Sequence, residues 1–325
     1  MKKSTKIILG TIAGLFLTGL LLLLIGVVAG GRNQAMDIIR EDAHISGSFG
    51  GWISGLITEE DDEETDNDSE EEADLGLKEI DATEKNNADE RIEIADGSKF
   101  NSLALSMGAG EFVIRESADD KVYLSDVKKL SVKTALKGDT LYVKAKPKTK
   151  RLWNFVNTVE GGTLVIYLPQ KEYNQVDLEL GAGELKLEQK LIAKEIELSL
   201  GAGEITGTHL QAEKLQAEVS AGSMTLVQIN AGRAEIEVSA GECVVEKASF
   251  EKLSVDVAMG SAEIGVDGKE EDTSYEAECS MGEVRIGKNV YLHQGTHDKD
   301  DAQGEKKRHI DAECGMGEIS ITFHE

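Results

Sequence analysis

Proline, cysteine and aromatic residues are all scarce in this sequence. Only two of the 325 residues are proline, three are cysteine, and 5% are aromatic. Because 40% of the residues are nevertheless apolar, the chain can bury a core, and that core must consist mainly of aliphatic side chains. The cysteines (Cys243, Cys279 and Cys314) form no CxxC pair and cannot all pair with one another. Neither a zinc site nor a disulfide framework is therefore indicated.

Positive charge is also in short supply. Lysine and arginine number 35 against 61 aspartates and glutamates, which gives a formal net charge of -26. Nucleic acid and anionic membrane surfaces would repel such a chain at long range, so we expect neither as the main partner. Basic surfaces remain as candidates.

One long apolar run stands near the start of the chain. Residues 7–29 carry no charge over 23 positions, and a helix of that length would extend roughly 35 Å, enough to cross a bilayer. The sequence therefore predicts a cytoplasmic N-terminus and a transmembrane signal anchor within residues 1–30. A cleaved signal peptide is the competing interpretation. Lys2, Lys3 and Lys6 precede the run, and the positive-inside rule then places the rest of the chain outside the cell.

Residues 31–90 have the composition of a juxtamembrane segment and an acidic disordered linker. Eleven of the fourteen residues from 59 to 72 are acidic, too polar to fold and self-repelling enough to extend. We interpret this run as a spacer between the membrane and residues 91–325. Weak binding of Ca²⁺ by these carboxylates is an alternative.

The rest of the chain is built from eight similar segments, such as VDLELGAGELKL and AEIEVSAGECVV. The central glycines are spaced by 73, 20, 19, 19, 19, 22 and 35 residues. A fixed period near 19 predicts an all-β solenoid, with insertions at the long intervals. The glycines are Gly110, Gly183, Gly203, Gly222, Gly241, Gly260, Gly282 and Gly317.

Each segment alternates apolar and polar residues, as expected for half-buried strands. Three residues before the glycine, the apolar position holds leucine, valine, methionine or, in the last two segments, Cys279 and Cys314. We predict that these two cysteines are core thiols, close enough to pair if their turns stack side by side. Four residues before the glycine, the polar position is mostly acidic and is predicted to face outward. The glycine allows a sharp corner between two strands.

Two features of the sequence resemble the DUF4097 family, β-strand repeat proteins of bacterial envelopes that carry an adhesin label. They are the segment GTLVIYLP, residues 162–169, and the GAGE-type repeats that follow it. The resemblance covers about residues 91–325. It implies a single-stranded, right-handed β-helix on a single-pass membrane protein, and it supplies no catalytic residues.

The long first interval contains a basic segment. Ten lysines or arginines lie between Lys121 and Arg151, against only two acidic residues. Strand-like runs at 121–124, 130–134 and 140–146 suggest additional turns of the solenoid. The loop 147–162 that follows could bind an anionic envelope polymer or lipid headgroup through charge and ring contacts. Alternatively, its rings cap the core and its lysines neutralise neighbouring acidic faces. The candidate loop residues are Lys148, Lys150, Arg151, Trp153 and Phe155.

No metal or cofactor site is predicted. Stacked acidic columns could share a divalent cation, but a solvated acidic face is favoured, and the aspartate-containing nonapeptides of calcium-binding repeats are missing. The insertion 287–309 contains His293, His297, Asp298 and His309, and its polar, unpatterned composition favours a flexible surface loop over a metal site.

Three functional classes remain, of which an enzyme is not expected, because no segment interrupts the repeat with a cluster of acid and base groups. The first is a non-catalytic binding or adhesion-like scaffold that contacts an envelope polymer or protein. The second is an envelope-stress or regulatory accessory that contacts a partner membrane protein. Because the sequence stops two residues after Phe323, we also expect an uncovered last turn that can self-associate.

Overall fold

The structure is a computed structural model that describes residues 77–80, 91–152, 156–159, 162–292, 295–299 and 307–324. Within these ranges the chain is all-β, as predicted, apart from three short 3-10 turns, η1 (Gly97–Lys99), η2 (Val127–Lys129) and η3 (Glu270–Asp272). None of the helices in this part is long and apolar enough to span a membrane. The predicted membrane segment, 7–29, and the acidic run, 59–72, lie outside the described residues.

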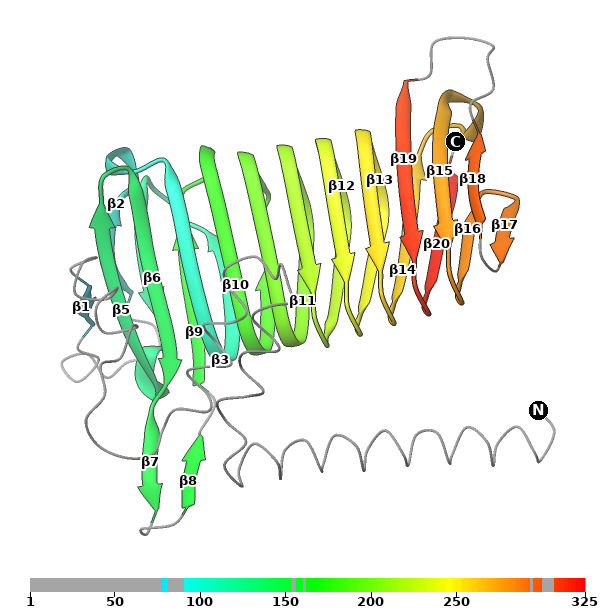
Figure 1. Cartoon of the computed structure of the whole chain (residues 1–325). Coiled ribbons are helices and arrows are strands. Elements are labelled where there is room, and N and C mark those ends of the chain that lie inside the picture. Colours follow the sequence, from blue (N-terminus) through cyan, green and yellow to red (C-terminus); the bar gives the residue numbers. More distant parts are fainter. Residues whose placement is uncertain are drawn as a thin grey trace. The chain divides into compact units, whose positions relative to one another are not determined.

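The repeats fold into coils that stack on one another (Figure 1). The central glycine of each repeat lies at the corner of its coil. We number the coils 1 to 8 in sequence order. The strand before the glycine is called the leading strand, and the strand after it the trailing strand. The first six coils are formed by β3 (Ser102–Glu116), β10 (Glu172–Leu187), β11 (Leu191–Val219), β12 (Ser223–Val238), β13 (Glu242–Val257) and β14 (Ser261–Asp267).

Leading strands pair in parallel with leading strands, and trailing strands with trailing strands. Leu178 of β10 lies opposite Leu198 of β11, and Ala217 at the end of β11 lies opposite Ile236 of β12. On the trailing side, Ile205 lies opposite Met224, which lies opposite Cys243. One sequence period is therefore one full coil, and the predicted solenoid is confirmed.

The core lies between the leading and trailing strands. All the positions predicted to point inward are buried, including Leu198, Met224 and the three cysteines. Cys279 and Cys314 lie opposite each other on adjacent strands, as predicted, and both are free thiols. Burial raises the pKa of the Cys314 thiol.

The coils do not stack in sequence order at the far end. The leading strand of coil 6, which is the C-terminal part of β13, pairs with β19 (Arg308–Cys314). The trailing strand of coil 6, β14, pairs with β20 (Glu318–His324). On the other side of coil 8, β19 pairs with β15 (Thr273–Cys279) and β20 pairs with β16 (Glu283–Ile286). Coil 8 is thus inserted between coils 6 and 7. The expectation that the turn ending at Phe323 forms an uncovered end was wrong.

Two antiparallel strands cover coil 7 instead. Strand β17 (Asn289–Leu292) pairs with β16, and β18 (Gly295–Lys299) pairs with β15. The prediction of a flexible loop for 287–309 was therefore wrong for these two stretches. These strands could not be recognised from the polar composition of the segment, because strands at the end of a stack bury little apolar surface and need few apolar residues.

The opposite end is also closed by antiparallel strands. A further parallel coil, made of β6 (Thr140–Pro147) and β9 (Gly162–Leu168), stacks on β3. Outside it, β5 (Leu130–Lys137) pairs antiparallel with β6, and β4 (Lys121–Ser125) pairs antiparallel with β9. Only one of the three predicted additional turns is therefore a coil strand. The outermost strands are β1 (Lys78–Glu79) on β5 and β2 (Ile92–Asp96) on β4.

The corner glycines form a ladder that leaves no space for side chains. A Cβ added to Gly241 would lie 2.3 Å from the carbonyl oxygen of Gly222 in the preceding coil. At the far end, Gly317 approaches Gly260 and Gly282 approaches Gly317 in the same way. The ladder thus follows the order of the coils in space, and it explains why every coil carries glycine at this position.

Candidate binding face

The outward surface of the leading strands carries two columns of carboxylates. They occupy the positions six and four residues before the corner glycine in coils 2 to 8, where the pairing register places these positions side by side from coil to coil. Gln216 and Ser254 interrupt the first column, and Ser199 interrupts the second. We call this surface the acidic face. It consists of Asp177, Glu179, Glu197, Glu218, Glu235, Glu237, Asp256, Glu276, Glu278, Asp311 and Glu313.

The carboxylates of the acidic face disfavour one another's charge. Burial, with Glu197 and Glu179 adding repulsion, raises the pKa of Asp177 to about 6. Lost solvation and neighbouring carboxylates likewise raise the pKa of Glu218, Glu237 and Glu313. Among the described residues, the ion pairs that form involve none of this face. A cationic group placed against it would relieve this repulsion.

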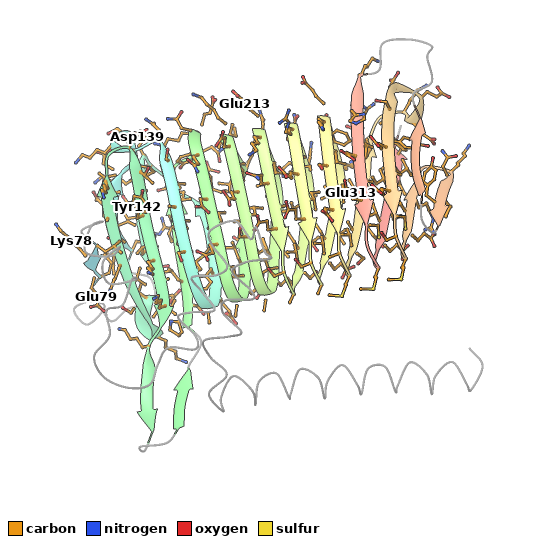
Figure 2. The ribbon with its side chains drawn as sticks, in the orientation of Figure 1. Lys78, Glu79, Asp139, Tyr142, Glu213 and Glu313 are labelled. Carbon is orange, nitrogen blue, oxygen red and sulfur yellow. The ribbon has the colours of Figure 1, made fainter. Side chains whose placement is uncertain are left out.

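The charge of this surface changes from negative to positive toward β5 and β6. In one row of outward positions, Glu179 is followed by Ser106 of β3, Lys144 of β6, Lys133 of β5 and Glu79 of β1. Figure 2 shows Glu79 near this end of the stack and Glu313 toward the other. We call this region the basic end. It includes Lys129, Lys133, Lys137, Lys144, Lys146 and Lys148.

The predicted ligand loop extends from the basic end. Lys148 is exposed, and its backbone N–H donates to the carbonyl of Lys129 at 3.0 Å. Lys150 and Arg151 lie on β7 (Thr149–Leu152), which forms an antiparallel hairpin with β8 (Val156–Val159). The segment is thus a hairpin rather than an irregular loop. Trp153 and Phe155 lie outside the described residues, so their role in binding stays a prediction.

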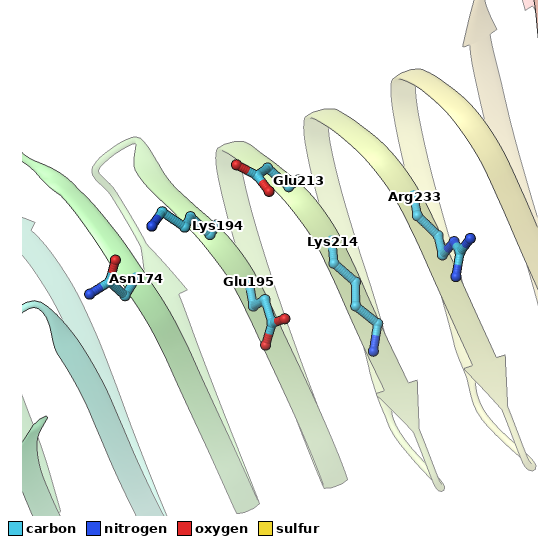
Figure 3. Close-up of a pocket in the computed structure, with 6 residues that line it drawn as sticks. All are labelled: Asn174, Lys194, Glu195, Glu213, Lys214 and Arg233. Carbon is cyan, nitrogen blue, oxygen red and sulfur yellow. The ribbon is translucent and has the colours of Figure 1, made fainter.

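A shallow depression lies along the edge of the leading strands, beside the acidic face. It has a volume of about 580 Å³, and Figure 3 shows its lining side chains arriving from successive coils. Lys214 lies directly opposite Arg233, and its Nζ donates to Gln216 at 2.9 Å. Because both cations and carboxylates line it, the depression suits charge-paired contacts with a polar partner. Its lining residues are Asn174, Lys194, Glu195, Glu213, Lys214 and Arg233.

No cluster of three or more His, Cys, Asp or Glu residues that could hold a metal ion occurs in the described part of the chain. Of the insertion residues weighed as ligands, His309 has its Nδ1 3.0 Å from the Ser274 hydroxyl, and His297 and Asp298 belong to β18. His293 lies outside the described ranges.

The sequence arguments did not identify a row of exposed methionines on the corners of the last three coils. Met259, Met281 and Met316 are between 50% and 68% exposed. The signal was present in the alignment, because these corners carry methionine where the first five carry alanine.

Several solved structures are similar to this chain at low identity. They include a "putative cell adhesion protein" from Clostridium sporogenes, with 15% identity over 72% of this chain and 100% of that one and a TM-score of 0.32. A "putative lipid binding protein" from Parabacteroides distasonis has 19% identity over 73% and 96% of the two chains, with a TM-score of 0.36. A "putative adhesin" from Bacteroides fragilis has 15% identity over 72% and 97%, with a TM-score of 0.30. Scores this low carry no argument about function.

A search among curated proteins gave no significant match. The family comparison is more informative, because the model for Toastrack DUF4097 matches residues 100–291, more than half of the chain. This range begins just before β3 and extends into β17, so it covers most of the stack described above. The chain belongs to the Toastrack DUF4097 family.

Proposed function

We propose that this protein is a non-catalytic, membrane-anchored scaffold that binds a cationic surface outside the cell through its acidic face. The observation that carries the proposal is the pair of carboxylate columns, in which burial and neighbouring carboxylates raise the pKa values of Asp177, Glu218, Glu237 and Glu313. A face that holds uncompensated negative charge gains most from a partner that supplies positive charge.

The repeating geometry suits a multivalent contact. Neighbouring coils lie about 4.8 Å apart, so the acidic face presents carboxylates at a regular spacing along the stack. A single exposed ion pair contributes only about 0–1 kcal/mol, which is too little for specific binding. Several such pairs formed together by a rigid face would add up to a useful affinity that decreases with salt.

The sequence supports the placement outside the cell. The uncharged segment 7–29 would supply the anchor, and the acidic segment 59–72 would supply an extended spacer. Protease added to whole cells should cut within that spacer. If the spacer is cut only after the cells are lysed, the proposed orientation is wrong.

The binding proposal can be tested by crosslinking in intact cells. The test variant replaces Glu218, Glu237 and Glu313 with glutamine, and the matched control replaces Glu204, Glu242 and Glu263, three exposed carboxylates on the trailing strands. Both variants lose three negative charges. Loss of crosslinked partners from the test variant alone supports the acidic face as the contact, whereas equal losses would show that only net charge matters.

A second candidate function, a regulatory accessory of a membrane protein, is favoured by the hairpin that carries Lys150 and Arg151. Cationic groups on such a projection could bind an acidic partner. The corresponding variant replaces Lys148, Lys150, Arg151, Trp153 and Phe155 with serine. If this variant loses its crosslinked partners while the acidic-face variant keeps them, the accessory function is the better description.

A further inference from the structure

Three methionines stand out on the surface of the last coils. The described part of the chain exposes six large apolar side chains, and half of them are Met259, Met281 and Met316. Their exposed fractions are 50%, 68% and 55%, respectively. They contribute little to the core, so packing does not explain their presence.

The insertion of coil 8 brings these methionines into consecutive positions. The backbone N–H of Met316 donates to the carbonyl of Ala258 at 2.8 Å, and that of Met281 donates to the carbonyl of Gly315 at 2.7 Å. The order in space is therefore Met259, Met316, Met281. With a coil spacing of about 4.8 Å, the outer two corners lie about 10 Å apart, with Met316 midway between them.

The fold does not require methionine at this corner. The equivalent residue is alanine in each of the first five coils. They are Ala109, Ala182, Ala202, Ala221 and Ala240. What the last three coils gain over the others is a set of thioether sulfurs on flexible side chains that can turn toward a shared point.

We propose that Met259, Met316 and Met281 together bind one Cu(I) ion through their thioether sulfurs. Thioethers are soft ligands that select Cu(I) over the harder divalent cations. Glu283 and Glu318 follow two residues after Met281 and Met316, where they add negative charge near the site, and Arg285 contacts both of them. This site lies on the corners rather than on the acidic face, so it is independent of the proposed function.

The protein used in the test must lack the buried cysteines, because thiolates also bind Cu(I). Cys279→Val and Cys314→Val copy the valines at the equivalent inward position in coils 4 to 6, and Cys243→Val copies Val284. This cysteine-free full-length chain, purified in detergent, is titrated with Cu(I) under anaerobic reducing conditions against the chromogenic chelator bicinchoninate. We expect it to remove a single equivalent of Cu(I) from the chelator.

Leucine substitutions separate sulfur chemistry from apolar contact. Met259→Leu, Met281→Leu and Met316→Leu together keep the apolar surface and should abolish Cu(I) uptake, whereas Met107→Leu, at a buried position, should leave it unchanged. Met316→Ala should weaken binding by more than roughly tenfold, the range that even outer-shell changes produce at metal sites. Met316→Ala should also weaken binding more than Met259→Ala does, because it removes the middle methionine and leaves the two outer ones, which lie farthest apart. If the parent chain takes up no Cu(I), or the triple leucine variant binds as well as the parent, the proposal is overturned.

Discussion

Replacing Gly241 with alanine should destabilise the stack severely, although it adds only one methyl group. The new Cβ would lie 2.3 Å from the Gly222 oxygen, 2.6 Å from Cγ1 of Val219 and 3.0 Å from the Gly222 nitrogen. Two of these three atoms are backbone atoms of the preceding coil, so a change of rotamer cannot relieve the overlap. The two coils would have to move apart at the corner.

The cost follows from the hydrogen bonds at that corner. The Glu242 N–H donates to the Gly222 carbonyl at 2.9 Å, and the Ser261 N–H donates to the Gly241 carbonyl at 3.0 Å. A displacement of about 1 Å would stretch such a bond beyond its useful range. These corner residues are half-buried or exposed, so each hydrogen bond lost there costs about 1 kcal/mol, to which the clash with Val219 and its loosened packing add. We therefore expect a loss of about 3–5 kcal/mol in the free energy of unfolding.

The measurement is urea unfolding of the full-length chain, followed by far-ultraviolet circular dichroism. Ala240→Ser is the matched control, because it changes the adjacent, exposed residue of the same corner and should stay within about 0.5 kcal/mol of the parent. A midpoint for Gly241→Ala no lower than that of Ala240→Ser would refute the glycine ladder.

Three further predictions test the core, the acidic face and the order of the coils. Leu198→Asp should unfold the stack because it places a charge among aliphatic side chains, while Glu237→Gln should be nearly silent in the same urea unfolding experiment; equal effects would contradict the assigned strand faces. Because the pKa of Asp177 is raised to about 6 from an ordinary value of 3.8, the folded chain binds more protons than the unfolded chain between these values. Stability should therefore rise as the pH falls from 7 toward 4, and Asp177→Asn should flatten that dependence; an unchanged pH profile would show that Asp177 is not responsible. Finally, amide hydrogens of β19 and β20 should exchange as slowly as those of β12, because coil 8 is internal, and fast exchange like that of a frayed terminus would argue against its insertion.

The faces of the strands could be predicted from the sequence because they depend on local alternation. Leu198 and Ile236 repeat one position of the period, and the structure buries both. The position of each corner was equally clear, because glycine marks a site where backbone meets backbone. These features need only the contacts within one coil and with its nearest neighbour.

The order and direction of the terminal strands could not be predicted in the same way. Coils 7 and 8 have nearly the same pattern, so coil 6 can accept either of them as its neighbour on the basis of register alone. Alternation is also identical for parallel and antiparallel strands, and for this reason β4 and β5 resembled additional turns.

The binding surfaces were only partly visible in the sequence. The acidic column four residues before the glycine followed directly from the alignment, as did the adjacency of Cys279 and Cys314, whereas the column six residues before the glycine was not identified. The continuity between Lys144 and the acidic face did not, because it depends on β6 stacking against β3, which precedes it in the chain. The methionine row required knowledge that Met316 lies between Met259 and Met281.

The insertion of coil 8 also affects how the chain matures. While residues 308–324 are still being synthesised, coil 6 lacks its final neighbour on its far side, and coil 7 cannot take its final place. The unfinished molecule therefore exposes open strand edges, which favour aggregation and proteolysis. When β19 and β20 fold, they pair with coil 6 on one side and with coil 7 on the other, so the open edges of both coils are covered together. Only molecules that contain residues 308–324 can complete the stack, so the fold distinguishes chains that have coil 8 from chains that lack it.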